Sequence, residues 1–490
     1  MSLVILAEIS GFFALFVNVL SSKPVYELAR RSSGDFTRQI GKLPLPRLLL
    51  YLIFRHSKDT ASASSTFWTS IGGVGPKPTR QDINSREDRV HPRVWPYLSM
   101  QFARLFYSSK LPRKHKGYNV LAADTSAVEM PYSKDAAELF GFHKSNHVKK
   151  ASDSGKVIAR CGGLLDVINR IFVDYVIEPF QKSEVQILVQ QLHAFLGLLG
   201  RKKTIILADR GYFSIALMVM AQQLGYKFCF RAKKYCYKNY TEKMKSDDEY
   251  IEIKLTRSML TRAFDAEARD YLEAYLEDTG FFRVRVVKRY FTNPETGAVE
   301  LGIYFTNLTP EEFSTNDVLD LYSMRWSIET AYMALKVVLE LERHSSLKPY
   351  IAINEIYGKI MYYNCCSIFG SQLELLLSDT DQRISKKSGK PERKNKYHYK
   401  LNVKGLLQQL YVEKLIKCLI AGNNIEDLVK EIWGNLVAMI NQLKTPIRKG
   451  RHYERWGKAV TASYKYKFLI DGRNHPKVAL VNGKMRTVKP

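Results

Sequence analysis

The stretch that decides the fold is KKTIILADRGYFSIALMVMAQQLG, residues 202–225. A short apolar run ends on Asp209, Gly211 provides a turn, and a helical run of apolar residues follows. This order predicts a strand, a turn and a helix, which is the unit of an α/β sheet. Functional residues in open α/β sheets gather at strand ends, so Asp209 is a candidate site residue. A helix N-cap is the alternative role, and both can hold at once.

The chain before this unit continues the same pattern. YNVLAAD is a short apolar run that ends at Asp124. VIARCGGLLDV (157–167) and IFVDYVIEP (171–179) are strand-like, and EVQILVQQLHAFLGLL (184–199) is helical. Asp124 therefore resembles Asp209 in following a predicted strand, and the two carboxylates are expected at one edge of a sheet.

A strand-rich block at 226–307 follows the unit. It contains YKFCFRAKKYCYKNY, YIEIKL, FFRVRVVKRYF and VELGIYFTN. The alternation in FRVRVVKRY (282–290) predicts antiparallel strands with one exposed face, on which Lys and Arg point outward. We interpret this block as a β insertion in the α/β domain.

Residues 1–115 are helical and basic in pattern. The first 20, MSLVILAEISGFFALFVNVL, are apolar enough for a membrane span, but Glu8 interrupts them and no basic segment precedes them. We expect a helix buried in a core. A Ser/Thr/Gly/Pro-rich connection at 61–79 is followed by helices at 79–88 and 91–109. A DNA-binding module is expected here, with a merely solubilising surface as the alternative, from Arg80, Arg86, Arg89, Arg93 and Arg104.

Residues 346–490 form a second helical flank, expected to serve dimerisation and DNA contact. Helices are predicted near 350–378, 403–421 and 425–443, with a basic linker at 383–400. The tail RKGRHYERWGKAVTASYKYKF mixes cations with Tyr and Trp, a mixture suited to phosphates and bases. A solvated terminus is the alternative to DNA contact by the tail residues Arg448, Lys449, Arg451 and Arg455.

The charge of the chain indicates the kind of partner. Its 490 residues include 75 Lys and Arg against 48 Asp and Glu, a formal net charge of +27. A polyanion such as nucleic acid is the first candidate, and an acidic membrane surface is the second. Six cysteines without a CxxC pair fit neither a disulfide framework nor a zinc site, so we expect reduced thiols in a cytosolic protein.

A further helix is expected at 315–342, TNDVLDLYSMRWSIETAYMALKVVLELE. At about 100° per residue, Tyr322, Arg325, Glu329 and Lys336 fall within roughly 60° of one another and share a face. An adjacent apolar face that can pack on a sheet consists of Leu321, Met324, Ile328 and Leu335. Periodicity alone favours a solvated ion pair for the Glu and Lys.

The spacing Y-x2-R-x3-E-x6-K of these four residues resembles the signature of the insertion-sequence-four family of bacterial DDE transposases. MRWSIET, with Trp after the Arg and Ile before the Glu, is similar to that family's catalytic helix. ILADRGYFS resembles the family's second-aspartate motif, and VLAADTSAV resembles its first. The resemblance is strong over 117–345 and loose at the two ends.

This resemblance implies an α/β fold at 116–345, an RNase H-like mixed-sheet catalytic core with a β insertion at about 226–307. Helical regions would flank this core on both sides. It also implies that Asp124, Asp209 and Glu329 form a catalytic triad that holds two Mg²⁺ ions, for which Mn²⁺ would substitute. Carboxylates suit Mg²⁺ because it is a hard cation that prefers oxygen ligands.

The remaining signature residues are expected to hold DNA. Tyr322, Arg325 and Lys336 cannot ligate Mg²⁺ well, and the resemblance places them on phosphates near the scissile bond. Arg210, which follows the second aspartate, is expected on DNA as well. Trp326 points about 100° away from Arg325 on an ideal helix and is expected to be a packing residue.

The activity that the resemblance implies is cut-and-paste transposition. Two-metal hydrolysis at terminal inverted repeats would be followed by attack of the freed 3′-OH on target DNA. The expected partners are double-stranded DNA at the repeats and at the target, and a second copy of the chain on paired ends. The expected location is the bacterial cytoplasm, at the nucleoid and away from membranes. A catalytically silent DNA-binding descendant and a host nuclease with the same core are the alternatives.

Several members of that family cut through a DNA hairpin and flip a base onto a Trp in the β insertion. This sequence has no Trp between Trp95 and Trp326, which leaves the hairpin step open. Other aromatic side chains could stack on a base instead, with strand packing as the alternative for each: Tyr235, Tyr237, Phe282, Tyr290 and Phe291.

Overall fold

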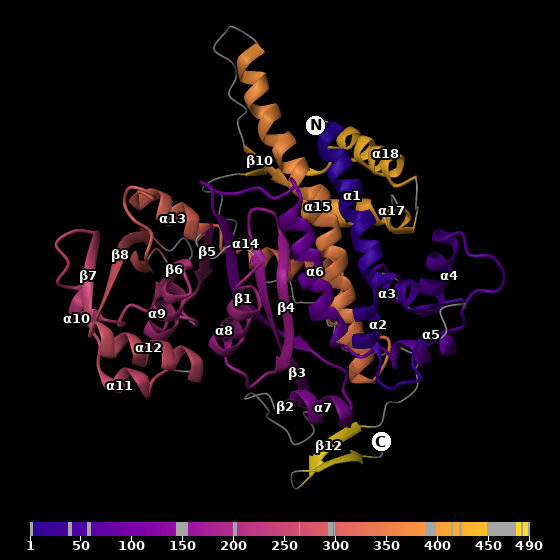
Figure 1. Cartoon of the computed structure of the whole chain (residues 1–490), viewed down its shortest axis with the longest axis horizontal. Helices are drawn as coiled ribbons and strands as arrows, with labels where there is room; N and C mark the ends of the chain where they lie inside the picture. Colours follow the sequence, from indigo (N-terminus) through magenta and orange to yellow (C-terminus); the bar gives the residue numbers. More distant parts are fainter. Residues whose placement is uncertain are drawn as a thin grey trace.

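The structure is a computed structural model that describes residues 3–37, 42–55, 60–143, 155–198, 203–263, 265–292, 297, 299–387, 398–412, 415–420, 424–447, 477–481 and 484–488. Within these residues the chain forms a central sheet with other elements on both sides of it (Figure 1). Helices from both ends of the sequence cover one side, and the segment around β7 and β8 extends away from the other. The long helix α15 (Pro349–Lys387) runs through the helical side.

One nine-stranded sheet unites the strands from β1 to β9. Its strands are β1 (Asn119–Glu129), β2 (Phe142–His143), β3 (Lys156–Asp166), β4 (Ile171–Pro179), β5 (Thr204–Ala208), β6 (Lys227–Ala232), β7 (Asp248–Lys254), β8 (Phe281–Thr292) and β9 (Val299–Thr306). β3 pairs antiparallel with β1 and β4, whereas β5 pairs parallel with β1, and β6 pairs parallel with β5. The resulting order β4–β3–β1–β5–β6 is RNase H-like, so the expected fold class is confirmed.

Helices connect these strands and cover the sheet. They are α7 (Lys134–Phe140), α8 (Glu184–Ala194) and α9 (Ile215–Gln223). α8 starts at a capping box in which Ser183 accepts a hydrogen bond from the amide of Gln186, and the Gln186 side chain accepts one from the amide of Ser183. α9 is buried over nearly its whole length because it joins two adjacent parallel strands.

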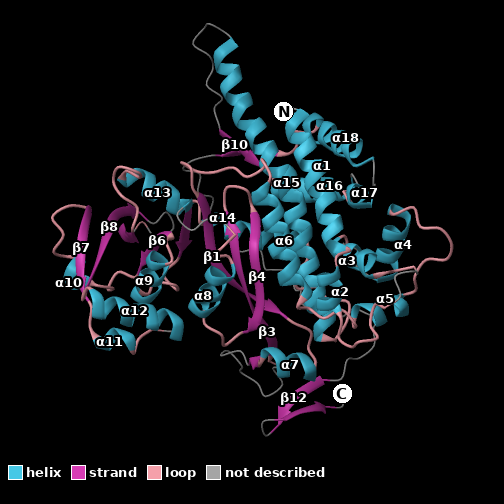
Figure 2. Cartoon of the chain, viewed as in Figure 1, coloured by secondary structure: helices cyan, strands magenta, loops and turns pink. Residues whose placement is uncertain are grey.

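The insertion begins later than the sequence pattern indicates. The strand-rich block was expected from residue 226, but β6 pairs with β5 and is therefore the last strand of the core. The inserted elements are α10 (Lys238–Thr241), β7, α11 (Arg257–Leu260), α12 (Ala266–Asp278), β8 and β9. β9 pairs antiparallel with β6, so the insertion continues the core sheet without a break (Figure 2).

The prediction that the basic side chains of β8 point outward is wrong for Arg285. Arg283 and Arg289 are exposed, but Arg285 is only 1% exposed. Its guanidinium donates to both carboxylate oxygens of Asp248, at 2.7 and 2.6 Å, and to the carbonyl of Phe313 at 2.7 Å. A buried arginine is stable when its donors are satisfied in this way, so local alternation does not decide its direction.

The described residues up to Ser108 are mainly helical, as expected, and one helix lies where a connection was predicted. The helices are α1 (Leu3–Leu20), α2 (Lys23–Ala29), α3 (Leu45–Ile53), α4 (Thr60–Ser70), α5 (Arg80–Glu87) and α6 (Val94–Ser108). α4 occupies most of the predicted Ser/Thr/Gly/Pro-rich connection. It forms because Ala63, Phe67 and Trp68 can be buried from one helical face, in spite of its Ser and Thr content.

α1 packs in the core by one face, as the sequence predicts. Phe13 and Phe16 are fully buried, and the Phe13 ring lies 5.9 Å from that of Phe369 in α15. Among the described residues no single helix is long and apolar enough to span a membrane. α1 from Val4 and α2 pass that test only as a pair bent by 52°, on length and composition.

The helix expected at 315–342 is divided into three parts, α13 (Thr315–Ser323), α14 (Trp326–Met333) and the π-helix η2 (Ala334–Val338). Between α13 and α14 the amide of Arg325 bonds to the carbonyl of Tyr322, three residues back. Such three-residue steps tighten the turn. Of the four residues of the predicted apolar face, Leu321, Ile328 and Leu335 are fully buried and Met324 is half-buried.

The C-terminal flank has the predicted helices with different bounds: α15 extends beyond the predicted 350–378, the helix predicted at 403–421 is divided into two, and the one predicted at 425–443 ends earlier. Its elements are β10 (His398–Leu401), α16 (Val403–Val412), α17 (Ile416–Ile420), α18 (Ile425–Ala438), β11 (Lys444–Ile447), β12 (Lys477–Val481) and β13 (Lys484–Val488). β10 pairs with β11, and β12 pairs with β13. The basic tail at 448–468 lies outside the described residues.

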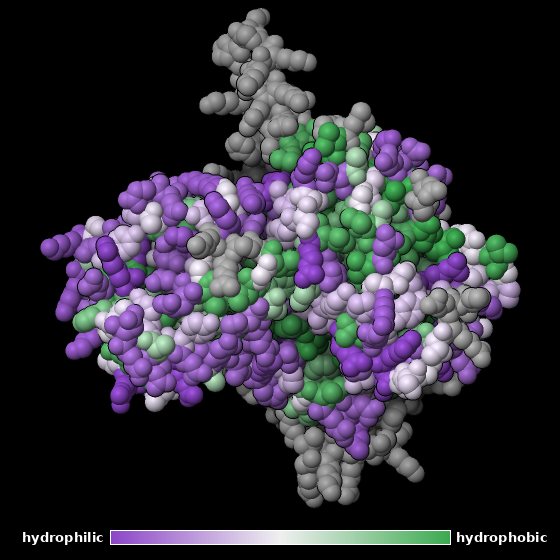
Figure 3. Space-filling view, in the orientation of Figure 1, coloured by the Kyte–Doolittle hydropathy of each residue, from purple (hydrophilic) through white to green (hydrophobic). Residues whose placement is uncertain are grey.

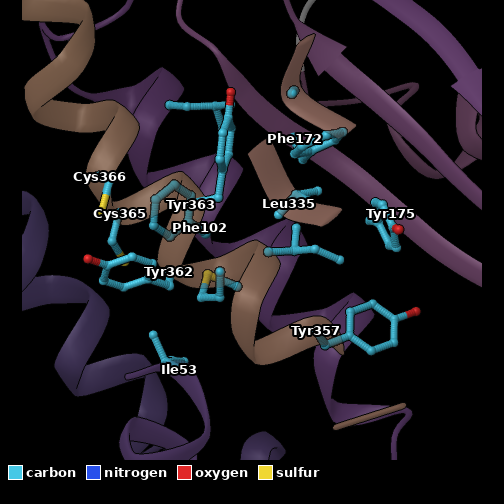
Figure 4. Packing of buried hydrophobic residues seen from close by; sticks show 14 of the residues in the cluster. Ile53, Phe102, Phe172, Tyr175, Leu335, Tyr357, Tyr362, Tyr363, Cys365 and Cys366 are labelled. Atoms are coloured by element: carbon cyan, nitrogen blue, oxygen red, sulfur yellow. The ribbon is translucent and has the colours of Figure 1, made fainter. Parts of the chain in front are cut away.

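The core centres on α15. From Ile351 to Leu373 every residue of this helix is buried, because α3, α6, α16 and β4 pack around it. Figure 4 shows Tyr357, Tyr362 and Tyr363 of α15 among Phe102, Phe172 and other buried side chains. All six cysteines are free, as expected, and five of them are buried. Figure 3 shows a largely hydrophilic surface over the insertion and more apolar residues around α1.

Candidate active site

Asp124 and Asp209 are brought together by the pairing of β1 with β5. Ala122 in β1 is the partner of Leu207 in β5, and the strands run parallel. Two residues further along, this register places Asp124 opposite Asp209. β1 does not end at Asp124, as the sequence pattern suggested, but continues to Glu129. It continues because its other edge remains paired with β3.

Glu329 reaches the two aspartates from α14, which packs on β1. The Tyr332 hydroxyl, one turn after Glu329, donates to the backbone carbonyl of Asp124 at 2.9 Å. A side chain at Gly163 would collide with this hydroxyl, since an added Cβ would lie 2.8 Å from it. The hydrogen bond and the glycine fix α14 closely against the strand that carries Asp124.

The carboxyl group of Asp124 lies within electrostatic reach of Asp209 and Glu329. Burial raises the pKa of Asp124 to about 7. The Arg325 guanidinium and the Thr125 amide oppose this rise, whereas the charges of Asp209 and Glu329 add to it. Like charges disfavour ionisation of a neighbouring carboxyl group, and a cation relieves the repulsion. The site is therefore one that an additional positive charge would stabilise.

Arg325 already supplies one positive charge. Its Nη2 donates to Oε1 of Glu329 at 2.6 Å, and its guanidinium lies 5.8 Å from the centre of the Tyr322 ring. Tyr322 is 9% exposed and packs on Tyr304 with ring centres 4.7 Å apart. Burial raises the pKa of the Tyr322 hydroxyl, so it remains a hydrogen-bond donor at neutral pH. The structure thus joins Tyr322, Arg325 and Glu329.

Lys336 is placed differently. It lies in η2, and its Nζ donates to the carbonyl of Ala127 at 2.6 Å, three residues beyond Asp124 on β1. The π-helix has wider turns than an α-helix, which changes the angle between Glu329 and Lys336 from the expected one. Arg210 is exposed beside Asp209. The tail residues Arg448, Lys449, Arg451 and Arg455 lie outside the described part of the chain.

Trp326 is not the packing residue that the sequence predicted. Its side chain is 63% exposed, and the exposed side chains of Met333 and Val337 continue the same strip along α14 and η2. These residues line a groove of about 500 Å³ whose other wall includes Lys400 and Lys404. The shortened helices turn Trp326 outward while Ile328 and Leu335 stay buried.

The aromatic residues of the insertion separate into two groups. Phe282 is fully buried and Tyr237 packs on Phe213, so strand packing accounts for both. Tyr235 and Tyr290 are 70% and 59% exposed. Only exposed rings can receive a base without unfolding the insertion.

Several neighbours of the site carry no sequence signal of their own. Glu184 at the start of α8 accepts a hydrogen bond from Thr125 at 2.6 Å and pairs with Arg160 at 2.8 Å. Thr125 is adjacent to Asp124, but Arg160 reaches the site through the pairing of β3 with β1, and Glu184 reaches it because α8 packs on these two strands. A motif search along the chain cannot find residues that the tertiary fold brings in.

The donor set suits a hard divalent cation, because carboxylate oxygens are the ligands that such ions prefer. Asp209 Oδ1 accepts a hydrogen bond from the Gly211 amide at 2.7 Å, and Asp124 Oδ1 accepts one from Thr125 at 2.9 Å. Within the described ranges, no three His, Cys, Asp or Glu side chains already converge closely enough to hold an ion. The Glu329 carboxylate is instead paired with the guanidinium of Arg325.

An RNase H-like sheet with one aspartate on a strand, a second directly after the parallel neighbouring strand and a glutamate on a helix packed on the sheet is typical of the DDE class of proteins. A family model described as the transposase DDE domain matches residues 115–365. The chain belongs to this transposase family, and the resemblance drawn from the motifs is confirmed.

Curated relatives carry the same designation. The transposase for insertion sequence element IS231F of Bacillus thuringiensis subsp. israelensis is 22% identical over 218 residues, which cover 38% of this chain and 46% of the relative. The transposase for IS231E of Bacillus thuringiensis subsp. finitimus is 22% identical over 247 residues, 44% of this chain and 50% of the relative. The chain spans about half the length of the curated relatives it matches.

Among solved structures, the chain is similar to a piggyBac transposase in a synaptic complex with hairpin DNA. The TM-score is 0.38 and the sequence identity is 10%, with 88% of this chain and 82% of the other chain covered.

Proposed function

We propose that this transposase moves an insertion sequence by a cut-and-paste reaction. It would hydrolyse phosphodiester bonds at terminal inverted repeats and join the freed 3′-OH ends to target DNA. The proposal rests on one observation: in a chain of the DDE transposase family, Asp209 and Glu329 lie within electrostatic reach of Asp124. The formal net charge of +27 suits a DNA partner.

Asp124, Asp209 and Glu329 would hold two divalent ions, Mg²⁺ or Mn²⁺. When bound, such ions activate an attacking water or 3′-OH and stabilise the leaving oxygen. A nearby cation would favour the ionised form of Asp124, because burial and the two neighbouring carboxylates raise its pKa to about 7.

Arg325 would change partners on DNA. In the structure it is bonded to Glu329 at 2.6 Å, and its buried Nε has no hydrogen-bond partner among the described residues. A DNA phosphate is a strong partner for a guanidinium, and it would draw Arg325 away from Glu329. Tyr322, Lys336 and the exposed Arg210 would hold neighbouring phosphates. DNA binding would thus complete the carboxylate set.

Cleavage of DNA that carries the inverted repeats flanking the gene tests the proposal. With Mn²⁺, the wild type is expected to cut at the repeat tip, whereas Asp209→Ala and Glu329→Ala lose cutting by at least a hundredfold. Asp320→Ala is the matched control, because Asp320 is an exposed carboxylate on α13 outside the signature. Equal cutting by wild type and Asp209→Ala would refute the assigned triad.

A second function, DNA binding without cleavage, is favoured by one observation. Glu329 forms an ion pair with Arg325, and within the described residues no three His, Cys, Asp or Glu side chains are arranged to hold a metal ion. Tight binding of repeat DNA by the wild type without any cut would establish this silent function. Cuts without preference for repeat ends would instead establish a nuclease. A dimer on paired DNA ends and a location at the bacterial nucleoid belong to the main proposal.

A further inference from the structure

Glu184, the first residue of α8, lies close to Thr125 of β1 and to Gly211 in the turn after β5. Its Oε1 accepts hydrogen bonds from Thr125 Oγ1 at 2.6 Å and from Arg160 Nη1 at 2.8 Å. Thr125 follows Asp124 on β1, and Arg160 comes from β3, the antiparallel neighbour of β1. One carboxylate oxygen is therefore fixed to the strand that carries Asp124.

The second oxygen of Glu184 faces the turn that carries Asp209. A Cβ added to Gly211 would lie 2.7 Å from Glu184 Oε2 and 3.1 Å from Asp209 Oδ1. The same Asp209 oxygen accepts a hydrogen bond from the Gly211 amide at 2.7 Å. The Glu184 carboxylate thus occupies the space beside the amide that orients Asp209, and Gly211 leaves room for it.

The surroundings hold Glu184 in this position. Ser183 caps α8 directly before it, and Val185 and Leu188 are buried against the sheet. Arg160 is itself fixed, because its Nε donates to the Phe180 carbonyl at 3.0 Å and its guanidinium lies 4.8 Å from the Phe180 ring centre. A side chain whose partners are themselves fixed can orient a functional group to within a fraction of an ångström.

We infer that Glu184 is a positioning residue of the transposase site, which sets Asp124 and Asp209 at the separation that the reaction needs. The inference rests on the proposed function, because it concerns the same carboxylates. The Glu184 side chain is 32% exposed, and partly exposed ion pairs add little to overall stability. Groups that orient metal-binding side chains nevertheless change metal affinity by about 10- to 100-fold.

The full chain without DNA provides the test, with Mn²⁺ alone as the probe in a calorimetric titration. Glu184→Ala is expected to raise the Mn²⁺ dissociation constant about tenfold or more. Glu184→Gln keeps an oxygen that can accept from Thr125 and Arg160, and is expected to stay within about threefold of the wild type. Glu178→Ala is the matched control, since it removes the ion pair of Glu178 with Lys182 shortly before α8.

Backbone hydrogen exchange of the turn at 209–213 adds a measurement that does not depend on the metal. Faster exchange in Glu184→Ala than in Glu184→Gln and Glu178→Ala is expected. If Glu184→Ala binds Mn²⁺ like the wild type and its turn exchanges at the same rate, the positioning role is overturned. Asp209→Ala separates the two proposals: measurable Mn²⁺ binding that is equal in the wild type and in Asp209→Ala refutes the proposed triad, and the exchange rates still decide the role of Glu184.

Discussion

Asp174 in β4 is a carboxyl group deep inside the core, 6% exposed. Burial raises its pKa to about 6, although hydrogen bonds with the Gln191 side chain and the Tyr175 amide oppose the rise. The folded protein therefore binds this proton more tightly than the unfolded chain does. The stabilising effect is complete below the unfolded pKa, near 4, and is lost as pH rises through 6.

We expect the free energy of unfolding of the wild type to fall by about 2–3 kcal/mol relative to Asp174→Asn between pH 4 and pH 7.5. Asparagine keeps the shape of the side chain and carries no titrating proton. Urea unfolding of both proteins across this range measures the difference. Parallel pH profiles for the two proteins would show that Asp174 is ionised in the fold.

At this scale, sequence motifs predicted the residues that chemistry constrains and missed those that packing constrains. The motifs around Asp124, Asp209 and Glu329 are local in sequence, and in the structure the carboxyl groups of Asp209 and Glu329 lie within electrostatic reach of that of Asp124. Arg285 and Trp326 depart from prediction because their exposure depends on partners distant along the chain. Alternation predicted an outward Arg285, but Asp248 and backbone carbonyls outside β8 take up its donors.

Among the elements, α15 crosses α3 so closely at Gly358 that a side chain there would collide with the backbone of α3. A Cβ on Gly358 would lie 2.3 Å from the Leu52 carbonyl oxygen and 2.7 Å from the Leu52 carbonyl carbon. Backbone atoms cannot move aside as a flexible side chain can. We expect Gly358→Ala to separate the helices and lower the free energy of unfolding by about 1–3 kcal/mol, measured by urea unfolding.

Gly434 in α18 provides the matched control, because an added Cβ meets nothing within 4 Å there. Alanine is the better helix former, so Gly434→Ala is expected to raise the stability by about 0.5–1 kcal/mol. Opposite signs for the two substitutions are the expected result. If Gly358→Ala also stabilised the protein, the crossing would be looser than the described contact.

Helices and strands with a regular spacing of apolar residues were predictable from the sequence, and the segment that combines α-helix with π-helix was not. The strands β3 and β4 and the helix α8 agree with their apolar patterns. The division of 315–342 into α13, α14 and η2 escaped prediction because a change of a few tens of degrees per turn leaves the apolar spacing almost intact. α4 escaped because Ser and Thr favour turns and caps when burial is ignored.

Across the whole molecule, one buried ionic cluster joins the N-terminal helices to α15. Arg55, after α3, pairs with Glu87 of α5 at 3.0 Å and with Glu355 of α15 at 2.7 Å, and donates to Thr60 at 2.9 Å. The side chains of Arg55, Glu87 and Glu355 are only 7%, 0% and 4% exposed. Removal of the Arg55 guanidinium would leave the carboxylates of Glu87 and Glu355 buried without this partner.

We expect Arg55→Met to lower the free energy of unfolding by about 3–5 kcal/mol, the usual cost of breaking a buried ion pair. Lys23→Met is the control, because the Lys23–Glu27 pair is 88% and 56% exposed and its loss should change the stability by less than about 1 kcal/mol. Guanidinium-induced unfolding gives both values. Equal effects of the two substitutions would contradict the described burial.

The sequence predicted the broad plan of the molecule but not how its parts join. Charge and composition indicated a basic protein, and the motifs indicated an α/β core with an insertion. The continuous sheet was not predictable, since it depends on pairing of β6 with β9, more than 60 residues later in the chain. Long-range pairing of this kind leaves no periodic trace in either strand.

The packing of α1 has a consequence for how the protein is made. α1 contacts α17 and α18, and Ile425, where α18 begins, is synthesised 405 residues after Leu20 (425 − 20). At about 5–20 residues per second, a ribosome needs about 20–80 seconds to cover that distance. For all that time the side of α1 that contacts α17 and α18 lacks its final partners, although Phe12 and Phe16 can already pack on Phe102 of α6.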